Sequence, residues 1–272
     1  MDNNQLIDNI KQQRLISVGA LFKESWNFYR SRFATLTGII AVPTIIAIVG
    51  AILLSYGKSS LASGPVLAGM IIIGVAGIIY VVSYLALVYA IVKSVGIKES
   101  YNLAVHNIFR YLWIFVLTLL ITLGGFIMGV VPGIMFSIWF MFSIYVLATE
   151  NQYGLSALLK SKEYIRGYWW QVLGRSLVVW LAIYGVIIAF QLLTSLIIKS
   201  VGNISDYVIQ VLAFPLAAVY SYLIFKHLAE IKPELANVTV TTKRSFFIFS
   251  AILGLVITIA LAVILFENET VK

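Results

Sequence analysis

GGFIMGVVPGIMF, residues 124–136, is the stretch of sequence that decides the fold. Five of its thirteen residues are Gly or Pro, none is charged, and apolar sequence continues from both of its ends. Gly and Pro are typical of turns, which in water-soluble chains run over the polar surface. A turn signal inside an apolar run therefore needs a reason, and the composition of the whole chain supplies it.

Composition places the chain among integral membrane proteins. Of its 272 residues, 61% are hydrophobic and 11% are charged, against roughly 45–50% and 25% in a typical globular domain. No polar stretch is long enough for a second folded unit, so we predict a single integral membrane domain over residues 1–272. The first apolar run begins only after Phe33, and we expect no cleaved signal peptide.

The apolar run around residues 124–136 is too long for one membrane crossing. Residues 111–149 are uncharged, and a helix of that length would extend about 58 Å, almost twice the ~30 Å of the hydrocarbon layer. We predict that the chain turns back here. Four residues are expected to serve the turn and the close packing of the two helices: Gly125, Gly129, Pro132 and Gly133.

The predicted fold is therefore an all-α, polytopic transmembrane helical bundle of about seven spans. Six uncharged stretches are long enough to cross a membrane, and the turn divides one of them in two. The predicted spans are residues 34–56, 66–92, 112–129, 132–149, 176–198, 206–225 and 245–266.

The distribution of Lys and Arg predicts the orientation of the bundle. Sixteen of the nineteen lie in the first, third, fifth and seventh of the eight flanks that seven spans leave. Because positive residues concentrate in cytoplasmic loops, we predict a cytoplasmic N-terminus and an outside C-terminus in a plasma membrane, with a prokaryotic one favoured by the short loops. The formal charge of +8 is assigned to this role rather than to nucleic acid, which would need a basic soluble face.

Three cytoplasmic flanks have helical periodicity: residues 17–33, 98–112 and 154–170. We predict amphipathic helices in the membrane interface, and the alternative is that each is a solvated extension of the following span. In the first flank the predicted apolar face comprises Val18, Phe22, Trp26, Tyr29 and Phe33. The basic residues expected at lipid headgroups, anionic ones among them, are Lys160, Lys162, Arg166, Arg30, Arg32 and Arg110.

One region of the chain resembles a known family. An apolar run with Pro132 and Gly133 is followed by a span that ends in Glu150 and then by a pattern of small and aromatic residues: Gly154, Ala157, Ser161, Gly167, Trp169 or Trp170, and Gly174. This pattern, over about fifty residues, resembles the membrane domain of some glycerophosphoryl diester phosphodiesterases and its uncharacterised stand-alone relatives. In that family the catalytic chemistry belongs to a separate soluble barrel domain. The resemblance therefore implies a membrane module of unassigned activity and no catalytic residue.

Residues that could carry chemistry are few. The chain has no cysteine and two histidines, His106 and His227, of which the second lies three residues before Glu230. Two ligands fall short of the three or four of usual protein metal sites. The predicted spans hold no Asp pair for an aspartyl protease, and no P-loop pattern occurs. We predict no enzymatic activity, no metal and no cofactor.

Glu150 is the acidic residue of most interest, because it ends the fourth predicted span on the basic cytoplasmic side. Two partners are open to it, Arg110 and Arg175. An interfacial ion pair, for which we name Glu150 and Arg175, is favoured over a substrate site.

The leading functional hypothesis is a non-enzymatic integral membrane module that binds lipid or organises a membrane or soluble protein partner. The alternative is a small transporter or lipid-translocating protein, which is favoured by kinks at Pro43 and Pro215 and by a faint repeat of a surface helix followed by two spans. An intramembrane enzyme is a third and weaker hypothesis.

Overall fold

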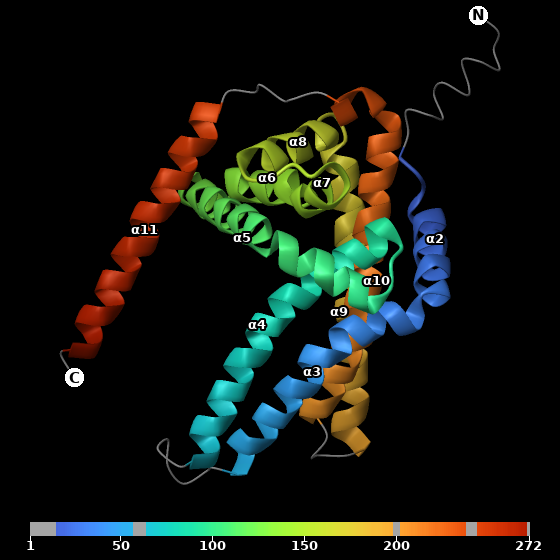
Figure 1. The fold of residues 1–272 in the computed structure, drawn as a ribbon. Coiled ribbons are helices and arrows are strands. Elements are labelled where there is room, and N and C mark those ends of the chain that lie inside the picture. Colours follow the sequence, from blue (N-terminus) through green and yellow to red (C-terminus); the bar gives the residue numbers. More distant parts are fainter. Residues whose placement is uncertain (1–14, 57–63, 198–201, 238–243, 271–272) are drawn as a thin grey trace, which may run out of the picture. The chain divides into compact units, whose positions relative to one another are not determined.

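The computed structural model describes residues 15–56, 64–197, 202–237 and 244–270. All regular structure in these ranges is helical (Figure 1). Six helices there are long and apolar enough to cross a membrane, so the predicted all-α polytopic membrane bundle is confirmed. Six basic residues that enter the orientation argument lie outside the described residues: Lys11, Arg14, Lys58, Lys199, Lys243 and Lys272.

The helices follow one another with short connections. They are α2 (Val18–Ser31), α3 (Phe33–Tyr56), α4 (Gly64–Lys93), α5 (Ile97–Met128), α6 (Val130–Phe140), α7 (Ser143–Glu150), α8 (Leu155–Ile165), α9 (Trp169–Ile197), α10 (Gly202–Ile231), the 3-10 helix η1 (Pro233–Asn237) and α11 (Arg244–Thr270). The six candidate spans are Phe33–Tyr56, Gly64–Lys93, Ile97–Met128, Val130–Glu150, Trp169–Leu192 and Gln210–Ile231. The predicted seventh span, 245–266, falls in α11, whose apolar part Ser245–Thr258 is shorter than these six, and it stays a prediction.

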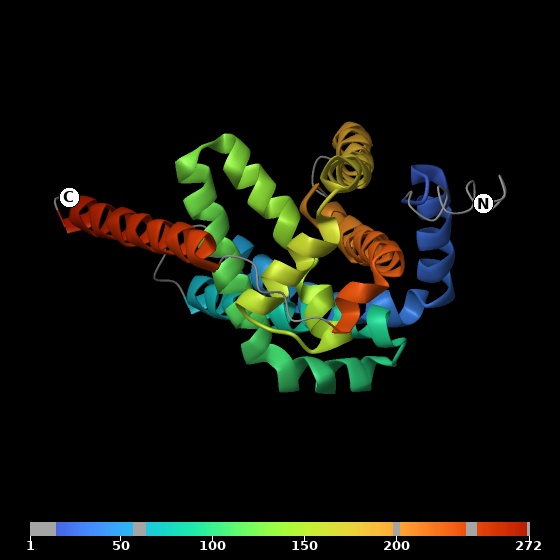
Figure 2. The ribbon, with the colours of Figure 1, turned by 90° about the horizontal axis from the view of Figure 1, so that it is seen from above.

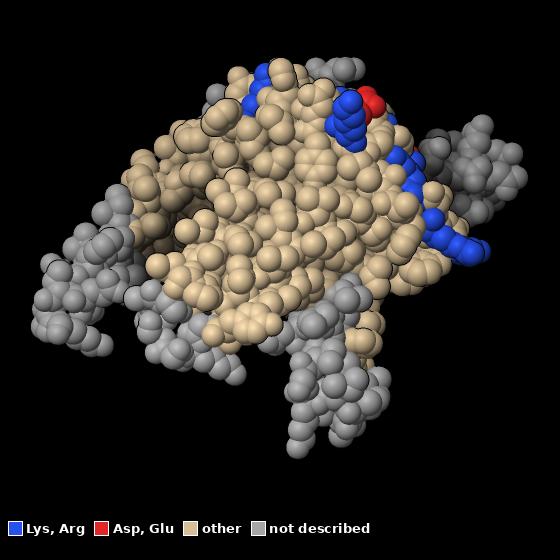
Figure 3. All heavy atoms as spheres, turned by 60° about the horizontal axis from the view of Figure 1, so that its bottom comes forward, with Lys and Arg blue, Asp and Glu red and all other residues tan. Residues whose placement is uncertain are grey.

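The chain forms two compact units. Unit 1 comprises Met1–Ile108 and Gly174–His227, and unit 2 comprises Phe109–Leu173 and Leu228–Lys272. This division reflects which residues pack together and does not test the number of domains. The single integral domain over residues 1–272 therefore stays a prediction. Uncharged residues make up nearly all of the described surface on the face drawn in Figure 3.

Unit 1 is built on the pair α3 and α4. Their backbones approach closely at Gly50 and Gly69, where a Cβ added at Gly69 would lie 2.9 Å from the carbonyl oxygen of Gly50. Small residues allow such close contact between apolar helices, for which lipid offers no hydrophobic driving force. The hydroxyl of Tyr101, in the first part of α5, donates to the carbonyl of Ile39 in α3 at 3.0 Å and lies 2.7 Å from the hydroxyl of Ser83 in α4.

Unit 2 contains the turn of residues 124–136. Helix α5 ends at Met128, Gly129 has φ 147°, and α6 begins at Val130. That φ favours Gly because it has no Cβ, and Pro132 lies in the first turn of α6, where its missing N–H is tolerated. The two helices lie side by side after the turn, because a Cβ at Gly133 would overlap the ring of Phe126 and a Cβ at Gly125 would lie 2.5 Å from that of Phe136. Figure 2 shows this reversal in green.

The helix after the turn is interrupted, which the sequence did not predict. Within the expected span 132–149, α6 ends at Phe140 and α7 begins at Ser143. The hydroxyl of Ser161 in α8 accepts from the N–H of Phe142 at 3.2 Å and donates to the carbonyl of Trp139 at 2.6 Å. A side chain that enters the backbone hydrogen-bond ladder in this way is a known cause of a break in a helix.

The three predicted surface helices take three different forms. Residues 18–31 form a separate helix, α2, before α3 begins at Phe33. Residues 98–112 belong to α5, which runs unbroken from Ile97 to Met128, so this flank extends the following span. The flank 154–170 forms α8 as far as Ile165 and then turns at Gly167, which has φ 85°, before α9 begins.

Candidate functional site

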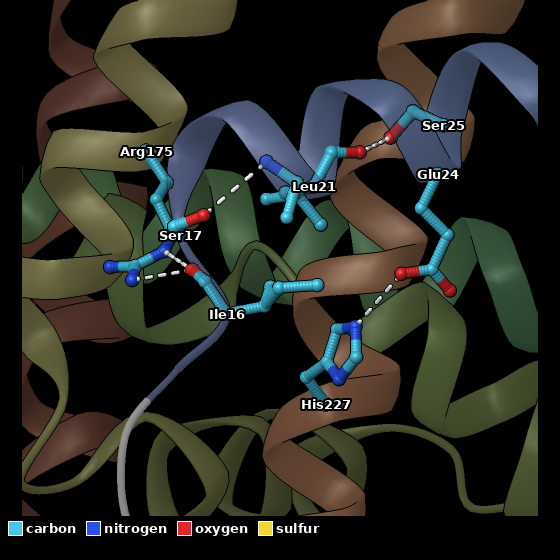
Figure 4. Close-up of polar contacts among 8 residues, drawn as sticks. Ile16, Ser17, Leu21, Glu24, Ser25, Arg175 and His227 are labelled. Carbon is cyan, nitrogen blue, oxygen red and sulfur yellow. Dashed lines mark hydrogen bonds and ion pairs between the residues drawn. The ribbon is translucent and has the colours of Figure 1, made fainter. Parts of the chain in front are cut away.

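The start of α2 is held by an arginine of α9 within unit 1 (Figure 4). The Nη2 of Arg175 donates to the carbonyl of Ile16 at 2.7 Å and to that of Leu15 at 3.0 Å, and its Nε donates to Ile16 at 3.0 Å. The side chain of Ser17 accepts from the N–H of Ala20 at 3.3 Å, which is the usual bond of a helix N-cap. The position at which α2 begins is therefore fixed by both local and tertiary hydrogen bonds.

A second contact holds α2 about two turns further along, at Glu24. Glu24 Oε2 lies 3.2 Å from Nε2 of His227 in α10 (Figure 4). The residues on the same side of α2, Leu21, Ser25 and Tyr29, are buried. This face of α2 is thus packed against the rest of unit 1.

The rest of the surface of α2 is exposed and carries two kinds of side chain. Val18, Phe22 and Trp26 are 36%, 45% and 47% exposed and follow one another at four-residue intervals, so they form one stripe. Lys23 and Arg30 are also exposed. The sequence places these three residues and Tyr29 on one apolar face. The three are exposed together as predicted, but the prediction is wrong for Tyr29, which is 4% exposed and lies on the packed side. An aromatic stripe beside basic residues is typical of a helix in the membrane interface.

Arg32, which the sequence assigns to headgroups, bonds to backbone instead. Its guanidinium donates to the carbonyls of Ala90, at 2.6 Å, and of Val95. These carbonyls flank Lys93, where α4 ends and where carbonyls lack helical partners. Arginine suits this position because its planar guanidinium can bond two acceptors at once.

In unit 2, Glu150 lies in a polar cluster with two residues of α8. The hydroxyl of Tyr164 donates to its Oε1 at 2.7 Å, and the ammonium of Lys160 forms an ion pair with its Oε2. Lys160 is 2% exposed. Burial raises the pKa of Tyr164, and the carboxylate of Glu150 raises it further. The cluster joins the end of α7 to the middle of α8.

Lys160 therefore lies inside unit 2, although the sequence places it on the polar face of an interfacial helix. The reason is that α8 packs against α6 and α7 together, so more than one of its faces is covered. A buried ammonium needs a counter-charge, and Glu150 supplies it. Arg175 belongs to unit 1, and its pairing with Glu150 stays a prediction.

The other predicted headgroup residues lie nearer the surface. Arg30, Arg110 and Arg166 are exposed; Arg110 donates to Asn151 at 2.7 Å and Arg166 pairs with Glu163 at 3.3 Å. Lys162 is half-buried, with its Nζ 5.0 Å from the ring centre of Trp139 and 4.9 Å from that of Phe247. Burial lowers the pKa of Lys162.

Lys232 has a role that sequence reasoning missed. Its Nζ donates to the carbonyls of Glu163, Tyr164 and Arg166 at 2.7, 3.1 and 2.6 Å, which are the carbonyls at the end of α8. Burial lowers the pKa of Lys232. Lysine commonly bonds to the last carbonyls of a helix, but here it comes from 66 residues or more away along the chain. Nothing in the local sequence indicates such a partner.

The fold and these contacts define the class, a multi-pass α-helical membrane protein. Within the described ranges, no group of three or more His, Asp or Glu side chains lies together in a way that could hold a metal ion. Comparisons of the chain with protein-family models, with curated proteins and with solved structures gave no match. The resemblance to the membrane domain of glycerophosphoryl diester phosphodiesterases stays a prediction.

Proposed function

We propose that this protein is a non-enzymatic membrane module that binds anionic lipid at the membrane surface. The observation that carries the proposal is α2. One of its faces is packed against unit 1, while its exposed surface presents Val18, Phe22 and Trp26 beside Lys23 and Arg30.

Each part of this surface matches a layer of the membrane. Phe22 and Trp26 would enter the boundary between headgroups and acyl chains, where Trp is enriched. Lys23 and Arg30 would lie at the phosphates, where a basic residue contributes about 1 kcal/mol on an anionic surface. Arg175 and the pair Glu24–His227 fix the helix before lipid arrives, which lowers the entropy lost on binding.

Two other functions are less well supported. A membrane or soluble protein partner could cover the same stripe, but basic residues at its edge favour an anionic membrane surface. A small transporter or lipid-translocating protein would need a path for its substrate. The groove described below is lined by apolar side chains, which suits an acyl chain better than a polar solute.

The proposal is tested by counting the lipids that stay bound. The protein would be reconstituted in phosphatidylcholine with phosphatidylglycerol, and native mass spectrometry would count the lipids of each kind that it retains. We expect the wild type to retain phosphatidylglycerol in preference. The double variant Lys23→Gln with Arg30→Gln should retain less of it, whereas Lys98→Gln, at another exposed lysine, should behave as the wild type. Equal retention of the two lipids by the wild type would contradict the proposal.

A further inference from the structure

Unit 2 has an apolar groove between α5 and α11. Its volume is about 180 Å³ and it is partly open to the surroundings. Leu117 and Ile121 of α5, Leu155 of α8, and Phe247, Ala251 and Leu255 of α11 are among its lining residues. From Phe247 to Leu255 the groove follows α11 for about 12 Å, at 1.5 Å per residue.

The walls of the groove are held by a contact between small residues. A Cβ at Gly124 would overlap the carbonyl oxygen of Ser250, and a Cβ at Gly254 would overlap that of Leu120. The hydroxyl of Ser250 also donates to the carbonyl of Ile121 at 3.0 Å. The backbones of α5 and α11 thus touch directly. The groove lies beside this contact, where Ala251 presents only a methyl group.

One end of the groove has a positive charge. Phe247 lines the groove, and Nζ of Lys162 lies 4.9 Å from the centre of its ring. Lys162 follows Leu155 by seven residues on α8, so both lie on the same side of that helix. Among the described residues, this ammonium contacts the ring faces of Trp139 and Phe247, and no ion pair with a carboxylate within 4.0 Å is found for it.

We propose that the groove binds one acyl chain of an anionic phospholipid whose phosphate is held by Lys162. Charge and polarity select this occupant, because a half-buried ammonium against Phe247, beside a partly open apolar groove, matches a phosphate joined to a hydrocarbon chain. The phosphate would also offset the desolvation that lowers the pKa of Lys162. The inference rests on the proposed function in that it names a particular lipid site, in unit 2 and distinct from α2.

The site is tested with a phosphatidylglycerol that carries a photoreactive diazirine near the end of one acyl chain. In detergent-solubilised wild type, we expect cross-links in residues 247–255 of α11 and in 117–121 of α5. Lys162→Gln should weaken phosphatidylglycerol binding by about tenfold, the loss of one charge-assisted hydrogen bond, and leave phosphatidylcholine unchanged. Lys162→Arg should restore binding in part. Lys98→Gln is the matched control for the loss of charge.

A groove-filling variant, Ala251→Phe, should reduce the binding of both lipids. If Ala251→Phe does not fold, the comparison of Lys162→Gln with Lys98→Gln decides whether the lipid site exists. The site is overturned if Lys162→Gln binds as Lys98→Gln does, if the cross-links fall outside α5 and α11, or if a second copy of the chain fills the groove and excludes lipid. Retention that depends on Lys23 and Arg30 but not on Lys162 would overturn this site and leave the proposed function standing. A wild type that retains no anionic lipid would overturn both.

Discussion

Tyr29 places a hydroxyl in the packing of α2 without a hydrogen-bond partner among the described residues. Its side chain is 4% exposed, and burial raises its pKa from 10.0 to about 12. An unsatisfied hydroxyl in such a place costs free energy that a ring alone would not. The contribution of Tyr29 to stability therefore comes from its ring, whose centre lies 5.4 Å from that of Phe33.

Tyr29→Phe should remove an alkaline loss of stability. Between pH 10 and pH 12 the unfolded chain releases the phenolic proton while the folded chain keeps it. The unfolded state then binds fewer protons, so stability falls as the pH rises through this window. Thermal unfolding in detergent, followed against pH, should show a smaller fall for Tyr29→Phe than for the wild type. Tyr56→Phe, at a residue 76% exposed, is the control, and an equal fall in both variants would refute the assignment.

Lys160→Gln should destabilise unit 2 by roughly 3 kcal/mol, because it leaves the carboxylate of Glu150 buried without its counter-charge. The double variant Glu150→Gln with Lys160→Gln should recover part of the loss. Chemical denaturation in mixed micelles measures the free energy of unfolding of both variants. The control is Arg166→Gln, which removes an exposed ion pair and should change the unfolding midpoint little. If Lys160→Gln shifts the midpoint as little as Arg166→Gln does, the buried ion pair does not stabilise unit 2.

At this scale the sequence predicts which residues are basic but not what they contact. Lys160, Arg32 and Arg30 have the same charge and lie in similar flanks, yet the first pairs with a carboxylate, the second bonds to carbonyls and the third is exposed. The partner of each is chosen by tertiary packing.

At the scale of elements, Arg175 contributes three of the hydrogen bonds that dock α2. The guanidinium of Arg175 bonds two successive carbonyls ahead of the helix, at Leu15 and Ile16. A lysine has the charge but lacks the planar fork that reaches both acceptors. The Glu24–His227 contact is a single bond by comparison.

Arg175→Lys and Arg175→Gln should both loosen α2, the second more strongly. We expect amide hydrogen exchange in residues 18–25 to speed up by about tenfold in Arg175→Gln, which corresponds to the loss of 1 to 2 kcal/mol of hydrogen bonding. Arg30→Gln, at an exposed arginine of the same helix, should leave the exchange unchanged. Unaltered exchange in Arg175→Gln would mean that apolar packing alone holds α2.

Gly124→Ala should displace α11 from α5, because its Cβ would overlap the backbone of Ser250. Overpacking of this kind typically costs 1 to 3 kcal/mol. Gly77→Ala, at a helical glycine with nothing within 4 Å of the added Cβ, should be neutral or slightly stabilising. Thermal unfolding of the two variants makes the comparison, and equal midpoints would contradict the close contact.

The sequence predicts one helix break and misses another for a physical reason. The break at Gly129 is visible because Gly and Pro are local signals. The break between Phe140 and Ser143 depends on the hydroxyl of Ser161, which is nineteen residues beyond Phe142. The periodicity of residues 17–33 correctly predicts the separate helix α2. The periodicity of residues 98–112 does not show that they continue into a span, because an interfacial helix and a helical extension of a span have the same pattern.

At the scale of the whole molecule, apolar composition is sufficient to predict the membrane class and the helical fold. Orientation rests on a charge count that includes residues outside the described ranges, and it stays a prediction. The lipid groove could not be predicted from the sequence at all, because it requires α5 and α11, more than a hundred residues apart, to meet at Gly124 and Gly254.

Orientation can be read from single cysteines, since the chain has none of its own. A cysteine at Gly64 or Val130 should react with a membrane-impermeant maleimide in intact cells, because the flanks after the first and third predicted spans are predicted to lie outside. A cysteine at Asn102 should react only after permeabilisation. All three are at exposed positions. The opposite pattern would invert the orientation, and reaction at Gly64 but not Val130 would contradict the predicted turn.

The position of α2 at the membrane surface, on which the proposed function rests, can be measured directly. Single nitroxide labels at Phe22→Cys, in the aromatic stripe, and at Asn27→Cys, on the exposed polar surface, would be compared by power saturation in vesicles that contain phosphatidylglycerol. We expect the label at residue 22 to be relaxed mainly by oxygen, which concentrates in the hydrocarbon, and the label at residue 27 mainly by a water-soluble nickel complex. Equal access of the nickel complex to both labels would place α2 in water and contradict its role at the membrane surface.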